Sequence, residues 1–421
     1  MPRGVRDTNP IQTITKKSII SVIEEAFKRF GFYPIETPAI ENLEMLNAKA
    51  YGEENQKEIY TLTGESTGLR FDFTVPLARY IAMNKNVNLP FKRYQIGNVW
   101  RKEEPQKMRY REFMQMDADI VGGKEILADS EVIAAAANAM QELQINCTIF
   151  INSRLILEAI ISHFGIKKDD STKAIRVIDK IRKLERADIV SQLTQFGIDA
   201  RLADELMEFI SKNDTNEEKL KRISQEIPET ASEIGKMSML LECIRKYEIK
   251  LQVKFDPSLA RGLDYYTSFV WEFISESENP KVPTLVSGGR YDKLIEAYAG
   301  RSIPATGISI GVDRVVDILY TGDKSYFSSN RVYLAYLSQD DYEYSLGVAI
   351  KLRAEGVYVD MNTTDRNLAK QLEYANALDF SNVIIIGKIE REKKVMKVKN
   401  LVSGKEDILS LEEAIKLLKV K

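Results

Sequence analysis

The segment with the most informative chemistry covers residues 259–267 and reads Leu-Ala-Arg-Gly-Leu-Asp-Tyr-Tyr-Thr. Arg261 is a permanent cation, and the glycine that follows it allows close approach of a backbone or a ligand. Tyr265 and Tyr266 each offer an apolar ring with a hydroxyl group at its end. These residue types suit a pocket for a planar, polar and anionic molecule. Taken alone, however, such a segment is more often a strand with buried tyrosines and an arginine paired with a carboxylate.

A second polar segment covers residues 100–113, where a proline-containing loop separates two strand-like runs, as in a long hairpin. Arg101 is suited to holding a phosphate with two hydrogen bonds, and Phe113 is suited to stacking on a planar base. The basic residues of the loop could contact the phosphates of an RNA backbone. These residues are Lys102, Lys107, Arg109 and Arg111. A charged hairpin that stands alone is usually only solvated.

A third segment, residues 307–314, predicts a glycine-bearing strand that enters a helix near Asp313. Small residues here would let a nucleotide approach the sheet, and Arg314 could cover the nucleotide from the helix. The alternative is an ordinary strand–helix junction. Because the chain has no Walker A sequence and no dinucleotide fingerprint, ATP would need some other cradle.

The hydrophobic pattern around these segments predicts an α+β part built on a largely antiparallel sheet. Helices are expected at 10–30 and 125–143, and residues 32–40 predict an extended edge strand interrupted by prolines. The other expected strands cover residues 69–74, 91–100, 113–121, 269–274 and 306–310.

Four regions are expected along the chain. Residues 1–164 and 251–322 would form the two parts of a catalytic core, interrupted by a helical insertion at 165–250. A linker is expected at 322–329. Residues 331–421 alternate between strand and helix patterns, which predicts an α/β module with a mainly parallel sheet.

Two details of that module are also predicted. Ser410 and Glu413 form a capping box that starts a last helix. The lysines of residues 388–399 either contact RNA or protect an edge strand from pairing, and the sequence leaves both readings open.

Composition limits the possible chemistry. The 421 residues carry 60 basic and 62 acidic side chains, so an RNA contact must use local patches. His163 is the one histidine, which rules out multi-histidine metal sites, and it is expected at a helix end. Cys147 and Cys243 form no disulfide framework and suit a reducing cytoplasm. No apolar run is long enough for a membrane span, and the start of the chain lacks a signal peptide's apolar core.

Together the segments resemble the class II aminoacyl-tRNA synthetases. Residues 31–38 are similar to motif 1, 101–119 to motif 2 and 307–314 to motif 3. More specific pieces resemble the histidyl-tRNA synthetase family, in an archaeal or eukaryotic form. These pieces are residues 69–79, 259–267 and 287–292. The resemblance implies a class II catalytic domain with an antiparallel sheet, a helical insertion and a C-terminal anticodon-binding domain. It also implies a homodimer through motif 1.

The resemblance implies a histidine pocket. The α-ammonium group would be bound by Asp72 and Thr74 together with Gln115, and the imidazole by Asp119 and Tyr266. Tyr265 would line the same pocket. Partners on both ring nitrogens would reject amino acids that cannot fill both hydrogen bonds.

The resemblance also implies an ATP site. Arg101 would bind the α-phosphate, Phe113 would stack on adenine, and Arg314 would meet the γ-phosphate or the adenine face. Arg261 would touch the histidine carboxylate and the α-phosphate, where two anions must meet. Mg²⁺ would accompany the pyrophosphate oxygens.

The implied function is therefore that of a cytoplasmic histidine–tRNA ligase acting on L-histidine, ATP and tRNA(His). One alternative is a non-catalytic paralogue, such as the regulatory subunit of ATP phosphoribosyltransferase. Such subunits usually lack the C-terminal module and lose the ATP arginines, whereas this chain has both. Another alternative is an RNA-binding sensor domain of the kind fused to stress kinases, but the chain carries no kinase signature.

Overall fold

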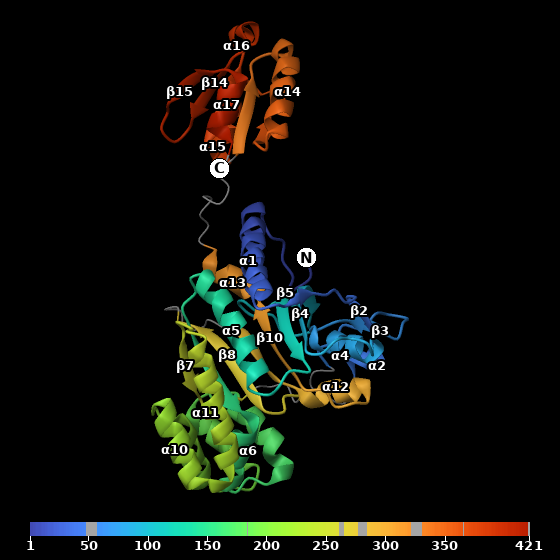
Figure 1. Cartoon of the computed structure of the whole chain (residues 1–421), viewed down its shortest axis with the longest axis vertical. Helices are drawn as coiled ribbons and strands as arrows, with labels where there is room; N and C mark the ends of the chain where they lie inside the picture. The colour runs from blue at the N-terminus through green and yellow to red at the C-terminus, as the bar shows by residue number, and fades with distance from the viewer. Residues whose placement is uncertain are drawn as a thin grey trace. The chain divides into compact units, whose positions relative to one another are not determined.

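The computed structural model describes residues 1–47, 57–182, 184–260, 265–276, 284–320, 331–364 and 366–419. The chain divides into two compact units (Figure 1). The first contains residues 1–7 and 16–319, and the second contains residues 8–15 and 320–421.

An eight-stranded sheet forms the centre of the first unit. Only its two outermost pairs, β1–β4 and β6–β7, are parallel, and all of the inner pairs are antiparallel. In spatial order the strands are β1 (Tyr33–Pro34), β4 (Phe91–Trp100), β5 (Glu112–Val121), β10 (Ala305–Gly311), β9 (Thr284–Arg290), β8 (Phe269–Ser275), β6 (Cys147–Ser153) and β7 (Gln252–Phe255).

Helices and a small hairpin pack around this sheet. The helix α5 (Leu127–Glu142) lies across β5, β9 and β10, beside α11 (Figure 1). Six alanines of α5 are buried, which allows its close approach to the strands. The remaining elements are α1 (Pro10–Arg29), β2 (Ile40–Asn42), α2 (Leu43–Leu46), β3 (Thr67–Leu69), α4 (Thr74–Met83), α12 (Asp292–Ala299) and α13 (Val312–Leu319).

The region expected as an insertion, together with the preceding helix α6, contains helices and turns but no strand among its described residues. Buried aliphatic residues such as Ile178, Leu206 and Met237 give these helices a common core. The helices are α6 (Arg154–His163), η2 (Lys168–Asp170), α7 (Ser171–Ile178), α8 (Arg186–Thr194), α9 (Ala200–Ser211), α10 (Asn216–Glu226), η3 (Pro228–Thr230) and α11 (Ala231–Lys246). His163 ends α6, as predicted, and Gly165 follows with a φ of +91°.

The second unit contains a five-stranded sheet with the order β12-β11-β13-β14-β15. Ser410 and Glu413 form the predicted capping box at its last helix. Its elements are β11 (Arg331–Tyr336), α14 (Gln339–Ala354), β12 (Tyr358–Met361), α15 (Leu368–Ala377), β13 (Asn382–Ile386), α16 (Lys388–Lys393), β14 (Met396–Asn400), β15 (Glu406–Leu409) and α17 (Leu411–Leu418).

Three expectations need correction. Residues 69–74 are not a strand, because β3 ends at Leu69 and α4 begins at Thr74. The C-terminal sheet is only half parallel, since β14 and β15 run antiparallel to their neighbours. The strand β14 lies between β13 and β15, so the lysines of residues 388–399 do not protect a sheet edge. The linker expected at 322–329 falls outside the described residues.

Among the described residues, no helix combines the length and the apolar character that a membrane span needs.

Candidate active site

A row of polar side chains follows one face of β5. Gln115, Asp117 and Asp119 alternate along the strand, so their side chains project to the same side of the sheet. All three are buried. On the neighbouring strand β10 they lie opposite Gly311, Ser309 and Gly307, in that order. The row therefore forms a buried acidic strip on one face of β5.

Asp119 is held by partners on two other strands. Arg93 lies opposite Asp119 in the β4–β5 ladder, and its Nη2 is 2.7 Å from Oδ2. The hydroxyl of Tyr291 donates a hydrogen bond to Oδ1. Burial raises the pKa of the Asp119 carboxyl, and Arg93 and Tyr291 oppose that shift. A Cβ on Gly307 would lie 1.9 Å from Oδ1, so only glycine leaves room for this carboxylate. The glycine predicted to admit a nucleotide thus makes space for Asp119.

The other two side chains of the row retain unused acceptors. Gln115 donates from Nε2 to the Ser309 hydroxyl at 2.6 Å. Within the described part of the chain, Gln115 Oε1 and Asp117 Oδ1 are buried without a hydrogen-bond partner. Burial and the nearby Asp119 charge raise the pKa of Asp117 to about 7. Buried acceptors without partners are rare, and here they would suit a cationic ligand.

Asp72 and Thr74 approach this row from the start of α4. Asp72 Oδ1 accepts hydrogen bonds from the backbone amides of Thr74, at 3.1 Å, and Val75, at 3.2 Å. These hydrogen bonds hold a turn between β3 and α4, so residues 69–74 do not continue as a strand. The Thr74 hydroxyl is hydrogen-bonded to Tyr265, which links this helix start to the tyrosine pair.

Tyr265 and Tyr266 pack against each other, with ring centroids 4.7 Å apart, and Tyr291 meets Tyr265 edge-on at 5.9 Å. Burial holds the pKa of Tyr265 well above its usual range, so its hydroxyl stays protonated. A Cβ on Gly289 would lie 2.7 Å from the Tyr266 ring. The tyrosines therefore form one wall of the same site. Arg261 lies outside the described residues.

The residues predicted to bind ATP surround the β4–β5 hairpin. The Arg101 guanidinium lies 5.1 Å from the centre of the Phe113 ring and donates from Nε to the Phe71 carbonyl at 3.0 Å. Arg314, on α13, donates from Nη1 to the Thr284 carbonyl at 2.7 Å and from Nε to the Met108 carbonyl at 3.4 Å. Arg101 and Phe113 are thus adjacent, and Arg314 contacts the loop between the two strands of their hairpin.

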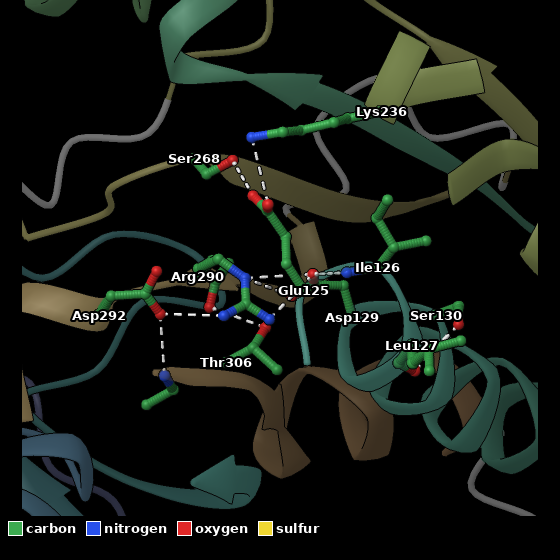
Figure 2. A network of polar contacts seen from close by, with 12 residues as sticks. Glu125, Ile126, Leu127, Asp129, Ser130, Lys236, Ser268, Arg290, Asp292 and Thr306 are labelled. Atoms are coloured by element: carbon green, nitrogen blue, oxygen red, sulfur yellow. Dashed lines mark hydrogen bonds and ion pairs between the residues drawn. The ribbon is translucent and has the colours of Figure 1, made fainter. Parts of the chain in front are cut away.

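A buried polar network supports the end of β9, directly before Tyr291 (Figure 2). Arg290 donates from Nε and Nη2 to Asp129 at 3.0–3.2 Å, and from Nη1 to Asp292 at 2.9 Å. Thr306 also hydrogen-bonds to Asp129. Because both side chains of the Arg290–Asp129 pair are at most 1% exposed, the network fixes the backbone one residue before Tyr291.

The start of β8 is tied to the same region. Ser268 donates to Glu125 Oε1 at 3.1 Å, and Lys236 of α11 lies 3.2 Å from Glu125 Oε2 (Figure 2). These contacts connect the insertion helices to the strand that follows the tyrosine pair.

Three functional candidates were missed from the sequence. Asp117 could have been found, because strict alternation along a strand places it with Gln115 and Asp119. Tyr291 lies in the quoted segment 287–292, but nothing in that segment reveals its contact with Asp119. Arg93 is recognisable only from the register of β4 against β5.

The large antiparallel sheet, with the polar site on β5 and β10 and the arginine-bearing hairpin at its edge, is the catalytic fold of class II aminoacyl-tRNA synthetases. The family model described as Histidyl-tRNA synthetase matches residues 4–315, and that described as Anticodon binding domain matches residues 331–421. The chain belongs to the histidyl-tRNA synthetase family.

Individual relatives agree with this assignment. A histidine–tRNA ligase from Korarchaeum cryptofilum is 36% identical over 98% of this chain and 99% of its own length. The corresponding ligase of Clostridium tetani is 34% identical over 99% of this chain and 97% of its own length. The crystal structure of histidyl-tRNA synthetase from Nostoc sp. PCC 7120 superposes with a TM-score of 0.85 at 28% identity, covering 99% of this chain and 98% of that one. These matches confirm the predicted fold class.

Proposed function

We propose that this chain is a histidine–tRNA ligase that activates histidine with ATP and transfers it to the 3′ end of tRNA(His). Full-length similarity to histidine–tRNA ligases supports the activity. The observation that carries the substrate assignment is the buried acidic row on β5, where Gln115 and Asp117 each keep an acceptor that no described residue fills. Such a row, beside protonated tyrosines, suits an amino acid with a cationic ammonium group and a polar ring.

In this proposal the α-ammonium of histidine is bound by acceptors from two elements. Asp72 and Thr74 contribute from the start of α4, and Gln115 contributes the buried Oε1. Asp119 and Tyr266 contact the imidazole, and Tyr265 lines the pocket. Arg93 and Tyr291 already contact the two carboxylate oxygens of Asp119. Each oxygen has room for a further hydrogen bond, so Asp119 can still accept one from the imidazole of histidine.

ATP would be bound beside the hairpin. Arg101 would contact the α-phosphate, Phe113 would stack on adenine, and Arg314 would meet the γ-phosphate or the adenine face. The contact between Arg101 and Phe113 supports a shared role for the two residues. Arg261 would bridge the histidine carboxylate and the α-phosphate. The Mg²⁺ ion enters as part of the substrate, MgATP, with ligands mainly from phosphate oxygens.

The first step joins a carboxylate oxygen of histidine to the α-phosphorus and breaks the bond to the bridging oxygen, so that pyrophosphate leaves. In the second step a hydroxyl of the terminal tRNA ribose attacks the histidyl carbonyl, and AMP leaves. The enzyme's main task in the first step is to hold two anions together with fixed cations. Neither step needs an enzyme histidine, consistent with His163 standing exposed at the end of α6.

The other regions would serve RNA binding and assembly. We assign residues 1–164 and 251–322 to the catalytic core, 165–250 to the insertion, and 331–421 to anticodon binding. The lysines of 388–399 would contribute to anticodon contacts. Exposed Tyr33 at the edge strand β1 suits a homodimer interface. We expect the enzyme to act in the cytoplasm.

Two measurements test this proposal. A tRNA(His) transcript should be charged with histidine, whereas a transcript for another amino acid should not be. Arg261→Ala should slow adenylate formation by about 10²- to 10³-fold without unfolding the protein, as expected for a preorganised electrostatic contact. Charging of unrelated transcripts at the same rate would contradict the tRNA assignment, and full activity of the variant would remove Arg261 from the mechanism.

A further inference from the structure

The N-terminal arm, residues 3–7, contacts the loop of the β4–β5 hairpin. The Gly4 carbonyl accepts a hydrogen bond from the Arg111 amide at 2.7 Å. Gly4 has a φ of +88°, and a Cβ there would lie 2.7 Å from Pro105 Cγ and 2.8 Å from Arg111 Cγ. The arm therefore packs directly on the loop, at a position that favours glycine both by backbone conformation and by space.

Arg6 joins this loop to the helix α13. From Nη1 it donates to the Tyr110 hydroxyl at 2.6 Å and to Asp317 Oδ1 at 2.8 Å, while its guanidinium lies 4.0 Å from the centre of the Tyr110 ring. The Tyr110 hydroxyl in turn donates to Asp317 Oδ2 at 2.9 Å. Arginine, tyrosine and aspartate thus form a closed triangle between three segments that are far apart in sequence.

Asp313 provides a second connection. Its Oδ2 accepts from the Met114 amide at 2.5 Å, and its Oδ1 lies 2.6 Å from Lys16 Nζ and 3.4 Å from Arg6 Nη2. Met114 directly follows Phe113, and Asp313 directly precedes Arg314. The network is therefore one residue away from two of the proposed ATP ligands.

We propose that Arg6 is a positioning residue for ATP, which fixes the β4–β5 hairpin against α13 so that Phe113 and Arg314 keep the separation that the nucleotide requires. This inference rests on the ATP site in the proposed function. Arg6 also neutralises Asp313 and Asp317, two carboxylates that would otherwise repel the triphosphate. Holding groups in a productive geometry before binding reduces the entropy lost when the ligand arrives.

The test compares Arg6→Ala with a matched arginine from the same arm. Arg3 pairs with Glu104, but the two side chains are 74% and 72% exposed, so Arg3→Ala should leave the kinetics unchanged. Arg6→Ala should raise the KM for ATP about tenfold in ATP–pyrophosphate exchange, while the KM for histidine changes less than about twofold. Arg6→Lys, which keeps the charge, should recover part of the loss.

Tyr110→Phe removes the hydroxyl shared by Arg6 and Asp317. If the triangle acts as a unit, the Arg6→Ala and Tyr110→Phe effects on the KM for ATP should be clearly less than additive when combined. Strict additivity would contradict the triangle.

An unchanged KM for ATP in Arg6→Ala would overturn the proposal. So would an equal rise in both KM values together with a lower melting temperature, because that pattern indicates a general structural defect. Calorimetric titration with MgATP gives the same comparison without turnover. If the wild-type protein failed to exchange with histidine, the proposed function would fail, yet weaker MgATP binding by Arg6→Ala would still support the positioning role.

Discussion

Arg93 and Asp119 face each other across the β4–β5 ladder, with the guanidinium Nη2 2.7 Å from the carboxylate Oδ2 and both side chains at most 3% exposed. The pair places a buried negative charge on β5. The positive charge of Arg93, on the neighbouring strand β4, balances it. Tyr291 and Gly307 then determine the direction of the other carboxylate oxygen. The orientation of Asp119 is thus controlled by three strands and by the residue that follows β9.

Removing the Tyr291 hydroxyl should impair histidine binding. Tyr291→Phe should raise the KM for histidine about tenfold or more, because a hydrogen bond to a charged group contributes about 1.5–3 kcal/mol. The KM for ATP should change little. Tyr94→Phe is a matched control, since Tyr94 also donates to a carboxylate, that of Glu24. Tyr94 directly follows Arg93 on β4, so its side chain projects from the opposite face of the sheet to that of Arg93. Equal losses in the two variants would argue against a specific role for Tyr291.

Adding a methyl group at Gly307 should displace Asp119. Because the new Cβ would lie 1.9 Å from Oδ1, the carboxylate must move, and Gly307→Ala should lower kcat/KM for histidine by more than about tenfold. Gly347→Ala is the control, because a Cβ added at this position on α14 would meet no atom of the described residues within 4 Å. Unaltered exchange kinetics in Gly307→Ala would show that the position of Asp119 is unimportant for histidine activation.

The ionisation of Asp117 should make stability pH-dependent. Its folded pKa of about 7 exceeds the unfolded value of about 3.9, so between these pH values the folded state retains a proton that the unfolded state has lost. Stability should therefore fall as the pH rises through this window. Asp117→Asn removes that effect, so between pH 5 and pH 8 its stability relative to wild type should rise by about 2–3 kcal/mol. Parallel pH profiles in chemical denaturation would contradict this assignment.

The Arg290–Asp129 pair should be important for stability. Asp129→Ala leaves a buried guanidinium without its main partner and should destabilise the protein by about 3–5 kcal/mol. Asp204→Ala breaks a pair with Arg186 that is about half exposed, and should cost less than about 1 kcal/mol. Denaturation midpoints give the comparison, and similar values for both variants would be inconsistent with a supporting role for the buried network.

Four strands of the central sheet, β4, β5, β8 and β10, could be predicted closely from the sequence, whereas β6, β7 and β9 were not expected. Strand β4 was expected at 91–100 and extends over Phe91–Trp100, because long runs with strand composition and turn signals at both ends define a strand locally. The family resemblance also predicted that Asp72, Thr74 and Tyr265 lie in one pocket. In the structure the Thr74 amide donates to Asp72, and the Thr74 hydroxyl is hydrogen-bonded to Tyr265.

What could not be predicted depends on contacts between distant segments. The helix that begins at Thr74 was not expected, because its start depends on hydrogen bonds from the Thr74 and Val75 amides to the Asp72 side chain, which composition alone does not reveal. The pairing of Arg93 with Asp119 follows from strand register, and that of Arg6 with Asp317 spans 311 residues. The sequence could not choose between RNA contact and edge protection for the lysines of 388–399, because a lysine-rich strand resembles an edge strand, and only the sheet order excludes the edge.

The most direct test of the central claim is ATP–pyrophosphate exchange by the wild-type protein with each of the twenty amino acids, in the absence of tRNA. We predict exchange with histidine alone. Exchange with a different amino acid would contradict the roles of Asp119 and Tyr266. Histidine binding without any exchange would instead indicate a non-catalytic paralogue and contradict the proposed ligase activity.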